Sequence, residues 1–296
     1  MRSVFLSGFA GIIGPPNAGK STLINRILGR KVAIVSPKPQ TTRNRIIGVY
    51  HRKDHQIIFV DTPGVHPTET LLHKSMVASA LAVTKEVDII LLIVEVGRAD
   101  APGISELIEE AAATNKPCLL AVNKIDAGKP DAALPVIERL SALHRFDEII
   151  PLSARTGLGV DTLLREIKSR LKPGPAFFPP DMDTDQSEAF VAGEIIREKI
   201  YLSVRNELPY SAAVTVENFE EAEDRPLLSI RAVVHVETLS QKKILVGAGG
   251  GMIKKIGAAA RRELERMFGI QVYLDLTVKT EKNWSRDARA LRRLGY

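Results

Sequence analysis

Short apolar runs alternate with segments of helical periodicity along the first part of the chain. The run 87–94 is apolar almost throughout, which is typical of a central strand buried on both faces of a parallel sheet. The segments between such runs place apolar residues three and four positions apart, which predicts amphipathic helices. We predict strands at 12–13, 56–60, 87–94, 117–122 and 149–152, and helices at 23–28, 71–85, 102–114, 132–143 and 160–171.

The segment 172–181 interrupts this pattern because it holds four prolines in ten residues. Proline disrupts helices and has no N–H to donate to a sheet, so we expect this segment to lie outside both and to be semi-rigid. We therefore predict a first domain at 1–172, a linker at 173–184 and a second domain at 185–296.

The second domain begins with a predicted helix at 187–207 and strands at 211–216 and 228–236. A further helical stretch, the loop Gly247-Ala248-Gly249-Gly250, a basic helix and a strand at 271–278 follow. Helix, strand, strand, helix, G-x-x-G, helix, strand is the order of a KH domain of the bacterial type. In such a domain the glycines allow close approach of a nucleic-acid backbone.

Composition and charge favour a folded, two-domain protein with a basic end. The 296 residues are 45% hydrophobic and 26% charged, which excludes wholesale disorder. Residues 241–296 hold 13 Lys and Arg against 5 Asp and Glu, whereas residues 181–240 hold 5 against 13. The basic end indicates a nucleic-acid or acidic-membrane contact, and its alternative is a solvated arginine-rich helix face.

Other residue types narrow the class of protein further. Cys118 is the only cysteine and lies in an apolar run, so we expect a buried strand thiol rather than a disulfide or a nucleophile. The apolar runs are too short to span a bilayer, and a cleaved signal peptide would destroy the glycine loop described next. We expect a cytoplasmic protein without a zinc site.

The stretch 14–22 carries the pattern G-x-x-x-x-G-K-S between a predicted strand and a predicted helix, which is typical of a P-loop. Its backbone N–H groups and the helix N-terminus would bind phosphate oxygens, with Lys20 at the outer phosphates and Ser21 at Mg²⁺. The candidate nucleotide-binding residues of this stretch are Gly14, Pro15, Pro16, Asn17, Ala18, Gly19, Lys20, Ser21 and Thr22.

Two further segments provide candidates for the Mg²⁺ and γ-phosphate sites. A polar loop at 36–45 offers a threonine hydroxyl, for which Thr42 is the first candidate and Thr41 the second. A predicted strand then leads into Asp61-Thr62-Pro63-Gly64, where the carboxylate would hold Mg²⁺ through water and the glycine would offer its N–H to the γ-phosphate. We predict Ser21, Thr42 and Asp61 at the metal and Lys20, Thr42 and Gly64 in catalysis.

The sequence Asn123-Lys124-Ile125-Asp126 predicts which nucleotide base is bound. Guanine presents two N–H donors on one edge that a carboxylate such as Asp126 accepts, whereas adenine would leave the charge unpaired, so GTP is favoured over ATP. Asn123 would brace the loops, and Lys124 would lie along the base. The loop Ser153-Ala154-Arg155 would offer a backbone N–H to guanine O6.

These motifs, in this order, resemble the Era family of GTPases, and the similarity continues through the G-x-x-G loop to Tyr296. The resemblance implies a doubly wound α/β P-loop GTPase domain followed by an α+β type II KH domain. It further implies binding of the 3′ end of 16S ribosomal RNA, a role in 30S subunit assembly, and peripheral contact with the inner membrane. We expect a monomer. The candidate RNA-binding residues are Lys242, Lys243, Gly247, Ala248, Gly249, Gly250, Lys254 and Lys255.

The chain departs from related patterns at two places. Val65 stands where small signalling GTPases carry a glutamine that orients water, so we expect slow intrinsic hydrolysis. In related hydrophobic-substituted GTPases the residue matching Asn17 helps to hold K⁺, which is therefore a second candidate cofactor beside Mg²⁺. The G-x-x-G loop lacks the lysine common in the family, and Lys254 and Lys255 would compensate.

Two other interpretations stay open at this point. The chain could be an RNA-binding or chaperone module for which the nucleotide is only a structural switch. It could also act on another RNA, such as tRNA or the large subunit.

Overall fold

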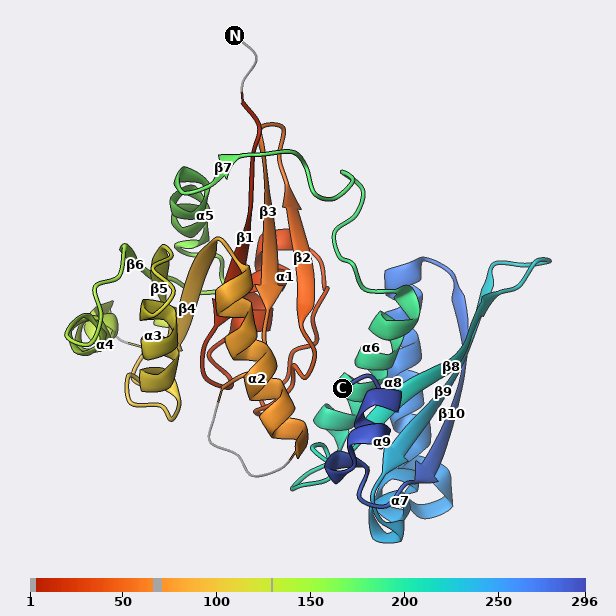
Figure 1. The fold of residues 1–296 in the computed structure, drawn as a ribbon. Coiled ribbons are helices and arrows are strands. Elements are labelled where there is room, and N and C mark those ends of the chain that lie inside the picture. The colour runs from red at the N-terminus through yellow and green to blue at the C-terminus, as the bar shows by residue number, and fades with distance from the viewer. Residues whose placement is uncertain (1–3, 66–70, 129) are drawn as a thin grey trace. The chain divides into compact units, whose positions relative to one another are not determined.

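The computed structural model describes residues 4–65, 71–128 and 130–296. The chain divides into two compact units, of which the first ends at Asp185 and the second comprises Gln186–Tyr296 together with Leu71 and Leu72 at the start of α2 (Figure 1). Each unit has its own hydrophobic core.

The first unit is built on a sheet with strand order β2-β3-β1-β4-β5-β6 and a short β7 beside β1. All neighbouring strands are parallel except the pairs β2–β3 and β1–β7. The carboxyl ends of β1, β3, β4 and β5 therefore meet at one edge of the sheet. The strands are β1 (Leu6–Ile13), β2 (Ile46–His51), β3 (His55–Asp61), β4 (Ile89–Glu95), β5 (Cys118–Asn123), β6 (Glu148–Pro151) and β7 (Lys172–Pro173).

Helices cover both faces of this sheet. One core cluster joins α1 and α5 to one face, and a second cluster joins α2, α3 and α4 to the other. This confirms the predicted doubly wound α/β fold with a mostly parallel sheet. The helices are α1 (Lys20–Leu28), α2 (Leu71–Glu86), α3 (Ile104–Ala112), α4 (Leu134–Ser141) and α5 (Val160–Ser169), with 3₁₀ turns η1 (Ile125–Ala127) and η2 (Pro130–Ala133).

The predicted burial of Cys118 at the start of β5 is confirmed, since its exposed fraction is 2%. Burial, with a smaller contribution from Asp147, raises the pKa of the thiol to about 12. The thiol is therefore protonated and inert at neutral pH. Within the described ranges, no helix is long and apolar enough to cross a membrane, and no three His, Cys, Asp or Glu residues form a metal-binding group.

The expectation that the proline-rich segment lies outside every sheet is wrong at its first two residues. β7 pairs antiparallel with Leu6 and Ser7 of β1. The sheet tolerates Pro173 because this strand is very short, and the next residue, Gly174, donates its N–H to the carbonyl of Phe5 at 3.1 Å.

The rest of the segment continues along the first unit. The side-chain oxygen of Gln56 on β3 accepts from the backbone N–H groups of Phe177 (2.7 Å) and Phe178 (3.1 Å). The N–H of Val49 on β2 donates to the carbonyl of Asp183 at 2.8 Å. These bonds fix the segment against β2 and β3.

The second unit is a three-stranded sheet in the order β10-β9-β8, with β9 and β10 parallel and β8 antiparallel to β9. Its core packs α6, α7 and α8 against the strands. This succession of elements confirms the predicted KH fold. The elements are α6 (Glu188–Ser203), β8 (Ala213–Glu221), β9 (Leu227–Val236), α7 (Leu239–Val246), η3 (Ala248–Gly250), α8 (Gly251–Phe268), β10 (Gln271–Thr280), η4 (Trp284–Arg286) and α9 (Ala288–Arg293).

Candidate active site and candidate RNA surface

The loop between β1 and α1 requires glycine at both ends. Gly14 has φ 157° and Gly19 has φ 101°, which L side chains rarely adopt. A Cβ at Gly14 would lie 2.3 Å from the carbonyl oxygen of Ile93, and a Cβ at Gly19 would lie 2.2 Å from Nδ2 of Asn123. The loop is therefore held tightly between β4 and the end of β5.

Lys20, the first residue of α1, is buried beneath this loop. Its ammonium donates to the carbonyl oxygens of Gly14 (2.9 Å) and Pro15 (3.0 Å). Burial lowers the pKa of Lys20 to about 8, although the nearby carboxylate of Asp61 opposes this shift. The side chain is thus still mainly cationic at neutral pH, as a phosphate-binding lysine must be.

Three oxygen-bearing side chains meet beside the loop. The hydroxyl of Ser21 donates to Oδ2 of Asp61 at 2.6 Å and lies 2.8 Å from Oγ1 of Thr42. Oγ1 of Thr42 also donates to Oδ2 of Asp61, at 3.5 Å. These residues come from α1, the 36–45 loop and the end of β3.

This cluster has the chemistry of a site for a hard divalent cation. Asp61 is fully buried, and its Oδ1 has no hydrogen-bond partner among the described residues. Burial raises the pKa of Asp61 to about 6, with Lys20 and the bond from Ser21 acting against the shift. A buried carboxylate oxygen without a donor, beside two hydroxyls, fits Mg²⁺, which prefers oxygen ligands.

The structure separates the two candidate threonines. Oγ1 of Thr41 lies 2.6 Å from the hydroxyl of Ser36 and donates to the carbonyl of Lys38 at 2.8 Å, so it bonds within its own loop. Only Thr42 directs its hydroxyl at Ser21 and Asp61.

Gly64 brings the backbone after β3 against the P-loop. A Cβ at this position would lie 2.8 Å from both the nitrogen and Cα of Pro16. The next residue, Val65, is only 5% exposed and belongs to the core cluster of α2 and α3. Its side chain therefore packs into the interior and offers no group that could orient a water molecule. The hydroxyl of Thr62 donates to the carbonyl of Ile12 at 2.8 Å.

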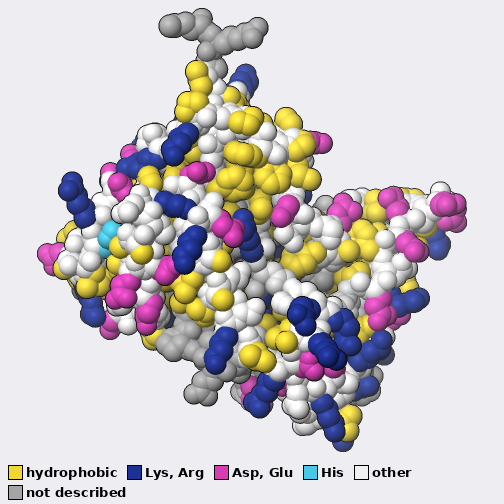
Figure 2. All heavy atoms as spheres, viewed as in Figure 1, with side chains coloured by type: hydrophobic (Ala, Val, Ile, Leu, Met, Phe, Trp, Pro, Cys, Tyr) yellow, Lys and Arg dark blue, Asp and Glu magenta, His cyan; other side chains and the backbone are white. Residues whose placement is uncertain are grey.

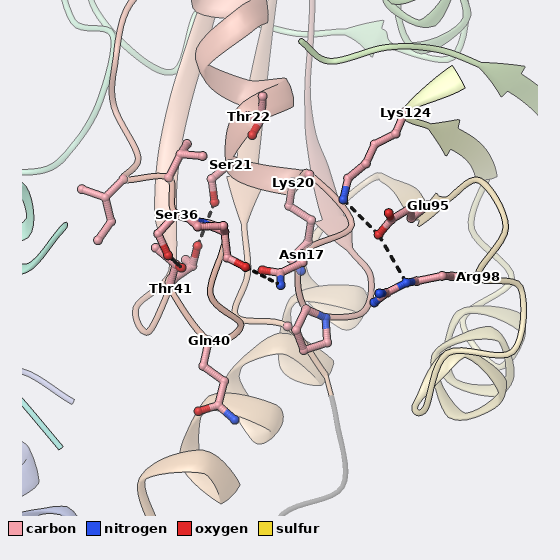
Figure 3. A pocket seen from close by; sticks show the side chains of 17 residues that line it. Asn17, Lys20, Ser21, Thr22, Ser36, Gln40, Thr41, Glu95, Arg98 and Lys124 are labelled. Atoms are coloured by element: carbon pink, nitrogen blue, oxygen red, sulfur yellow. Dashed lines mark hydrogen bonds and ion pairs between the residues drawn. The ribbon is translucent and has the colours of Figure 1, made fainter. Parts of the chain in front are cut away.

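These residues surround a cavity of about 370 Å³ (Figure 3). The predicted residues in its wall are Pro16, Asn17, Gly19, Lys20, Ser21, Thr22, Thr41, Thr42, Gly64 and Lys124. The cavity is also lined by residues that the sequence reasoning did not name as site candidates: Ile34, Val35, Ser36, Pro37, Gln40, Glu95 and Arg98. Glu95 could have been predicted from the sequence, because it ends β4 at the same sheet edge as Asp61 and Asn123.

Asn123 bridges the P-loop and the loop after β6. Its Nδ2 donates to the carbonyl of Ala18 at 2.7 Å, and its Oδ1 accepts from the N–H of Ala154 at 2.9 Å. Lys124 has φ 67°, and its ammonium lies 2.9 Å from Oε2 of Glu95. In Figure 3, Lys124 and Arg98 both point toward Glu95.

Asp126, the carboxylate predicted to read the base, lies in η1 beside the 153–155 loop. A hydrogen bond with Ser153, followed in importance by the charge of Arg155, lowers the pKa of Asp126. Nη2 of Arg155 is 2.5 Å from Oδ2 of Asp126. The predicted residues of both loops thus come together, and of these residues Lys124 lines the cavity.

In the second unit, Gly247, Gly249 and Gly250 all have positive φ (73°, 56° and 77°). A Cβ at Gly247 would lie 2.8 Å from the backbone nitrogen of Met252, so the loop folds directly onto the start of α8. Lys254 and Lys255 are exposed in the first turn of α8. Lys243 is exposed and Lys242 is half-buried, both on α7.

Next to this loop, a groove of about 320 Å³ lies between α8 and β10. Its lining is mostly apolar, with two cationic side chains: Ile253, Lys254, Gly257, Ala258, Arg261, Leu274 and Leu276. A groove of this kind accommodates unstacked bases while the adjoining lysines contact phosphates. Figure 2 shows Lys and Arg side chains gathered over α9, and Asp and Glu at the β8–β9 turn.

A P-loop with an N-K-x-D base loop on a doubly wound sheet, followed by a G-x-x-G unit, defines a GTPase that carries a KH domain. Residues 9–124 match the family model described as 50S ribosome-binding GTPase, and residues 207–285 match the KH domain model.

Full-length relatives specify the family. The chain is 47% identical to GTPase Era of Geobacter metallireducens, over 99% of this chain and 98% of the relative. A crystal structure of an Aquifex aeolicus Era variant bound to GDP and AlF₄⁻ matches with a TM-score of 0.95 and 37% identity, over 99% of both chains. A structure of Era with MgGDPNP and nucleotides 1506–1542 of 16S ribosomal RNA matches equally well, with TM-score 0.95, 37% identity and 99% coverage of both. The chain belongs to the Era family of GTPases.

Proposed function

We propose that this chain hydrolyses GTP to GDP and phosphate, and that its KH domain binds the 3′ end of 16S ribosomal RNA during assembly of the 30S subunit. The observation that carries the enzymatic part is the convergence of Ser21, Thr42 and Asp61 beside the P-loop, with Oδ1 of Asp61 lacking a donor among the described residues. The RNA part is supported by the Era structure that contains MgGDPNP and 16S RNA nucleotides.

Different residues of the site would bind the phosphates, the base and the metal ion. The P-loop amides and Lys20 bind the phosphates, and Asp126 accepts the two N–H donors of guanine. Ser21, Thr42 and Asp61 would hold Mg²⁺, which supplies positive charge to the β- and γ-phosphate oxygens when bound. The N–H of Gly64 would donate to the γ-phosphate, because only glycine lets this backbone approach Pro16 so closely.

Single-turnover GTP hydrolysis with and without RNA tests the enzymatic proposal. We expect phosphate release in both conditions and a preference for GTP over ATP in binding calorimetry. A chain that binds RNA but releases no phosphate in either condition would instead be a module with a nucleotide switch.

The identity of the RNA needs its own test. The family model that covers 9–124 carries the 50S subunit in its name, whereas the full-length structural relative holds 16S RNA. Crosslinking followed by sequencing of the bound RNA should recover the 3′ end of 16S RNA. Recovery of large-subunit RNA or tRNA would overturn the proposed RNA partner without affecting the proposed GTP hydrolysis.

We further propose slow intrinsic hydrolysis assisted by K⁺. Val65 packs into the core and has no group to orient water. Asn17 has φ 62°, lines the cavity and donates from Nδ2 to the carbonyl of Pro37 at 3.0 Å, which supports a role for its side chain at the phosphate site. Turnover should be higher in KCl than in NaCl, and Asn17→Ala should remove the difference. Equal rates in both salts would exclude the cation.

The cellular setting is proposed from the family resemblance. We propose a cytoplasmic monomer with peripheral contact to the inner membrane. Sedimentation of the purified chain and fractionation of cells test these points separately.

A further inference from the structure

The carboxylate that reads the base already has a cationic partner within the chain. Nη2 of Arg155 lies 2.5 Å from Oδ2 of Asp126, whose side chain is only 14% exposed. Ser153 is hydrogen-bonded to the same carboxylate. The base-reading group is therefore engaged by its own loop.

The backbone of Arg155 is held by hydrogen bonds, whereas its side chain is exposed beyond the contact with Asp126. Arg26 on α1 donates to the carbonyl of Arg155 through Nη2 and to the carbonyl of Ala154 through Nε at 3.2 Å. The side chain of Arg155, in contrast, is 76% exposed. The guanidinium is thus able to leave Asp126 by rotation of its own side chain without moving the loop.

Guanine and Arg155 make competing demands on the same oxygen. Guanine presents N1–H and N2–H₂ together, and both donors are satisfied only if both carboxylate oxygens accept. A guanidinium on Oδ2 draws on the same acceptor oxygen and the same negative charge that one of these donors uses. A carboxylate oxygen has two lone pairs, so both can bind at once, but each weakens the acceptor that the other uses.

We propose that Arg155 is an internal competitor for the guanine base, which weakens the pairing of the base with Asp126 and thereby speeds release of bound GDP. This inference rests on the proposed GTP site and concerns how that site releases its product, GDP. Exposed ion pairs contribute free energies equivalent to about one- to fivefold in an equilibrium constant, so the effect is modest.

Release of fluorescent GDP, labelled on the ribose, measures the competition directly. We expect Arg155→Ala to slow GDP dissociation about two- to fivefold. Arg155→Lys keeps a donor and a positive charge and should release GDP within about twofold of wild type. Arg165→Ala is the matched control, because Arg165 is an exposed arginine of α5 that bonds Thr162.

Salt gives a readout that needs no variant. Salt screens an exposed ion pair, so added choline chloride at constant KCl should slow GDP release from the wild type and leave Arg155→Ala nearly unchanged. The ratio between the two rates should approach one at high salt.

A second background tests whether the effect passes through Asp126. Asp126→Asn replaces one acceptor by a donor and therefore suits xanthine, which has a carbonyl at position 2, better than guanine. The neutral amide holds Arg155 weakly. In this background, Arg155→Ala should leave release of labelled xanthosine diphosphate unchanged.

The outcomes separate this inference from the proposed function. If Arg155→Ala releases GDP at the wild-type rate or faster, Arg155 does not compete and the inference is overturned, while the GTP site stands. If the wild type does not bind labelled GDP at all, the proposed function itself fails.

Discussion

Adjacent threonines in the loop after α1 have different environments, and this difference is testable. Thr42 reaches Ser21 and Asp61, whereas the hydroxyl of Thr41 bonds Ser36 and Lys38. We expect Thr42→Ala to lower the Mg²⁺-dependent rate of GTP hydrolysis by at least the roughly 10- to 100-fold that loss of an outer-shell metal partner costs. Phosphate release at saturating GTP, titrated with MgCl₂, measures the loss.

Thr41→Ala is the matched control for this substitution. It removes a hydroxyl from the same loop without touching the metal cluster, so its rate should stay within about threefold of wild type, as expected for a neutral hydrogen bond. A larger loss for Thr41→Ala than for Thr42→Ala would contradict the assignment of the metal ligand.

Single residues also show which parts of the candidate site the sequence predicts and which parts it does not. Gly14, Gly19 and Gly64 stand out in the sequence because short motifs require them, and the structure gives each a steric reason. The side chain of Arg155 does not stand out, since its importance depends on which loops become neighbours. Burial of Val65 likewise follows from packing against α2 and α3 rather than from any motif.

The strands of the second unit contain a titratable group with a pH-dependent role. His235 on β9 is 9% exposed, and its ring nitrogens contact Oγ1 of Thr215 (2.9 Å) and Oε2 of Glu281 (3.0 Å). Burial first, then the positive charges of Arg293 and Lys279, lower the pKa of His235. The neutral ring satisfies both contacts, because one nitrogen donates to the carboxylate and the other accepts from the hydroxyl.

The sign of the pH effect follows from this lowered pKa. The unfolded chain takes up the proton at a higher pH than the folded chain, so the contribution of His235 is present above about pH 6.5 and is lost as pH falls below it. We expect the wild type to lose thermal stability of the second unit between pH 6.5 and 5, and His235→Gln to show a flatter profile.

The fluorescence of Trp284 measures this unfolding. It is the only tryptophan of the chain, it is buried, and its Nε1 donates to the carbonyl of Ser211 at 3.0 Å. His144→Gln, in the first unit, is the control and should keep the wild-type profile of Trp284. Equal pH profiles for His235→Gln and wild type would show that this histidine does not set the acid sensitivity.

The first turn of α8 makes a prediction about RNA affinity. The G-x-x-G loop has no lysine of its own, and Lys254 and Lys255 are the exposed cations that follow it directly. If each contacts a phosphate, the association constant for RNA should fall less steeply with salt when both are replaced by alanine. The slope of its logarithm against log salt should be smaller in magnitude by about 1.4 for single-stranded RNA. Fluorescence anisotropy with a 16S 3′-end oligonucleotide measures this slope, and Lys282→Ala, also exposed, should leave it unchanged.

Element by element, periodicity predicted most of the fold, and the exceptions have physical causes. β2 gave no clear signal because Gly48 interrupts its apolar run, where a Cβ would lie 2.8 Å from Cδ1 of Leu28. β8 runs to Glu221 rather than 216 because pairing with β9, across an irregularity between Val216 and Asn218, extends the strand into polar residues. β7 depends on β1 alone. Pairing partners decide such elements, and no local pattern encodes them.

Considered as a whole, the chain joins a nucleotide site in one compact unit to a basic, glycine-looped surface in the other. Charge is also unevenly distributed along the second part of the chain, since the acidic residues of 181–240 precede the basic residues of 241–296. A switch protein requires more than the presence of two sites. The affinity of one ligand must depend on the other.

Linkage turns this requirement into a quantitative prediction. If GTP raises the affinity for the 16S 3′-end RNA relative to GDP by some factor, then the RNA must raise the affinity for GTP relative to GDP by the same factor. Allosteric couplings of this kind typically lie at about 5- to 150-fold. We expect tighter RNA binding with a non-hydrolysable GTP analogue than with GDP, measured by anisotropy, and the reciprocal change in nucleotide affinity, measured by calorimetry. Equal RNA affinities in the two nucleotide states would contradict this prediction. The two sites would then be independent, and GTP hydrolysis would not change RNA binding.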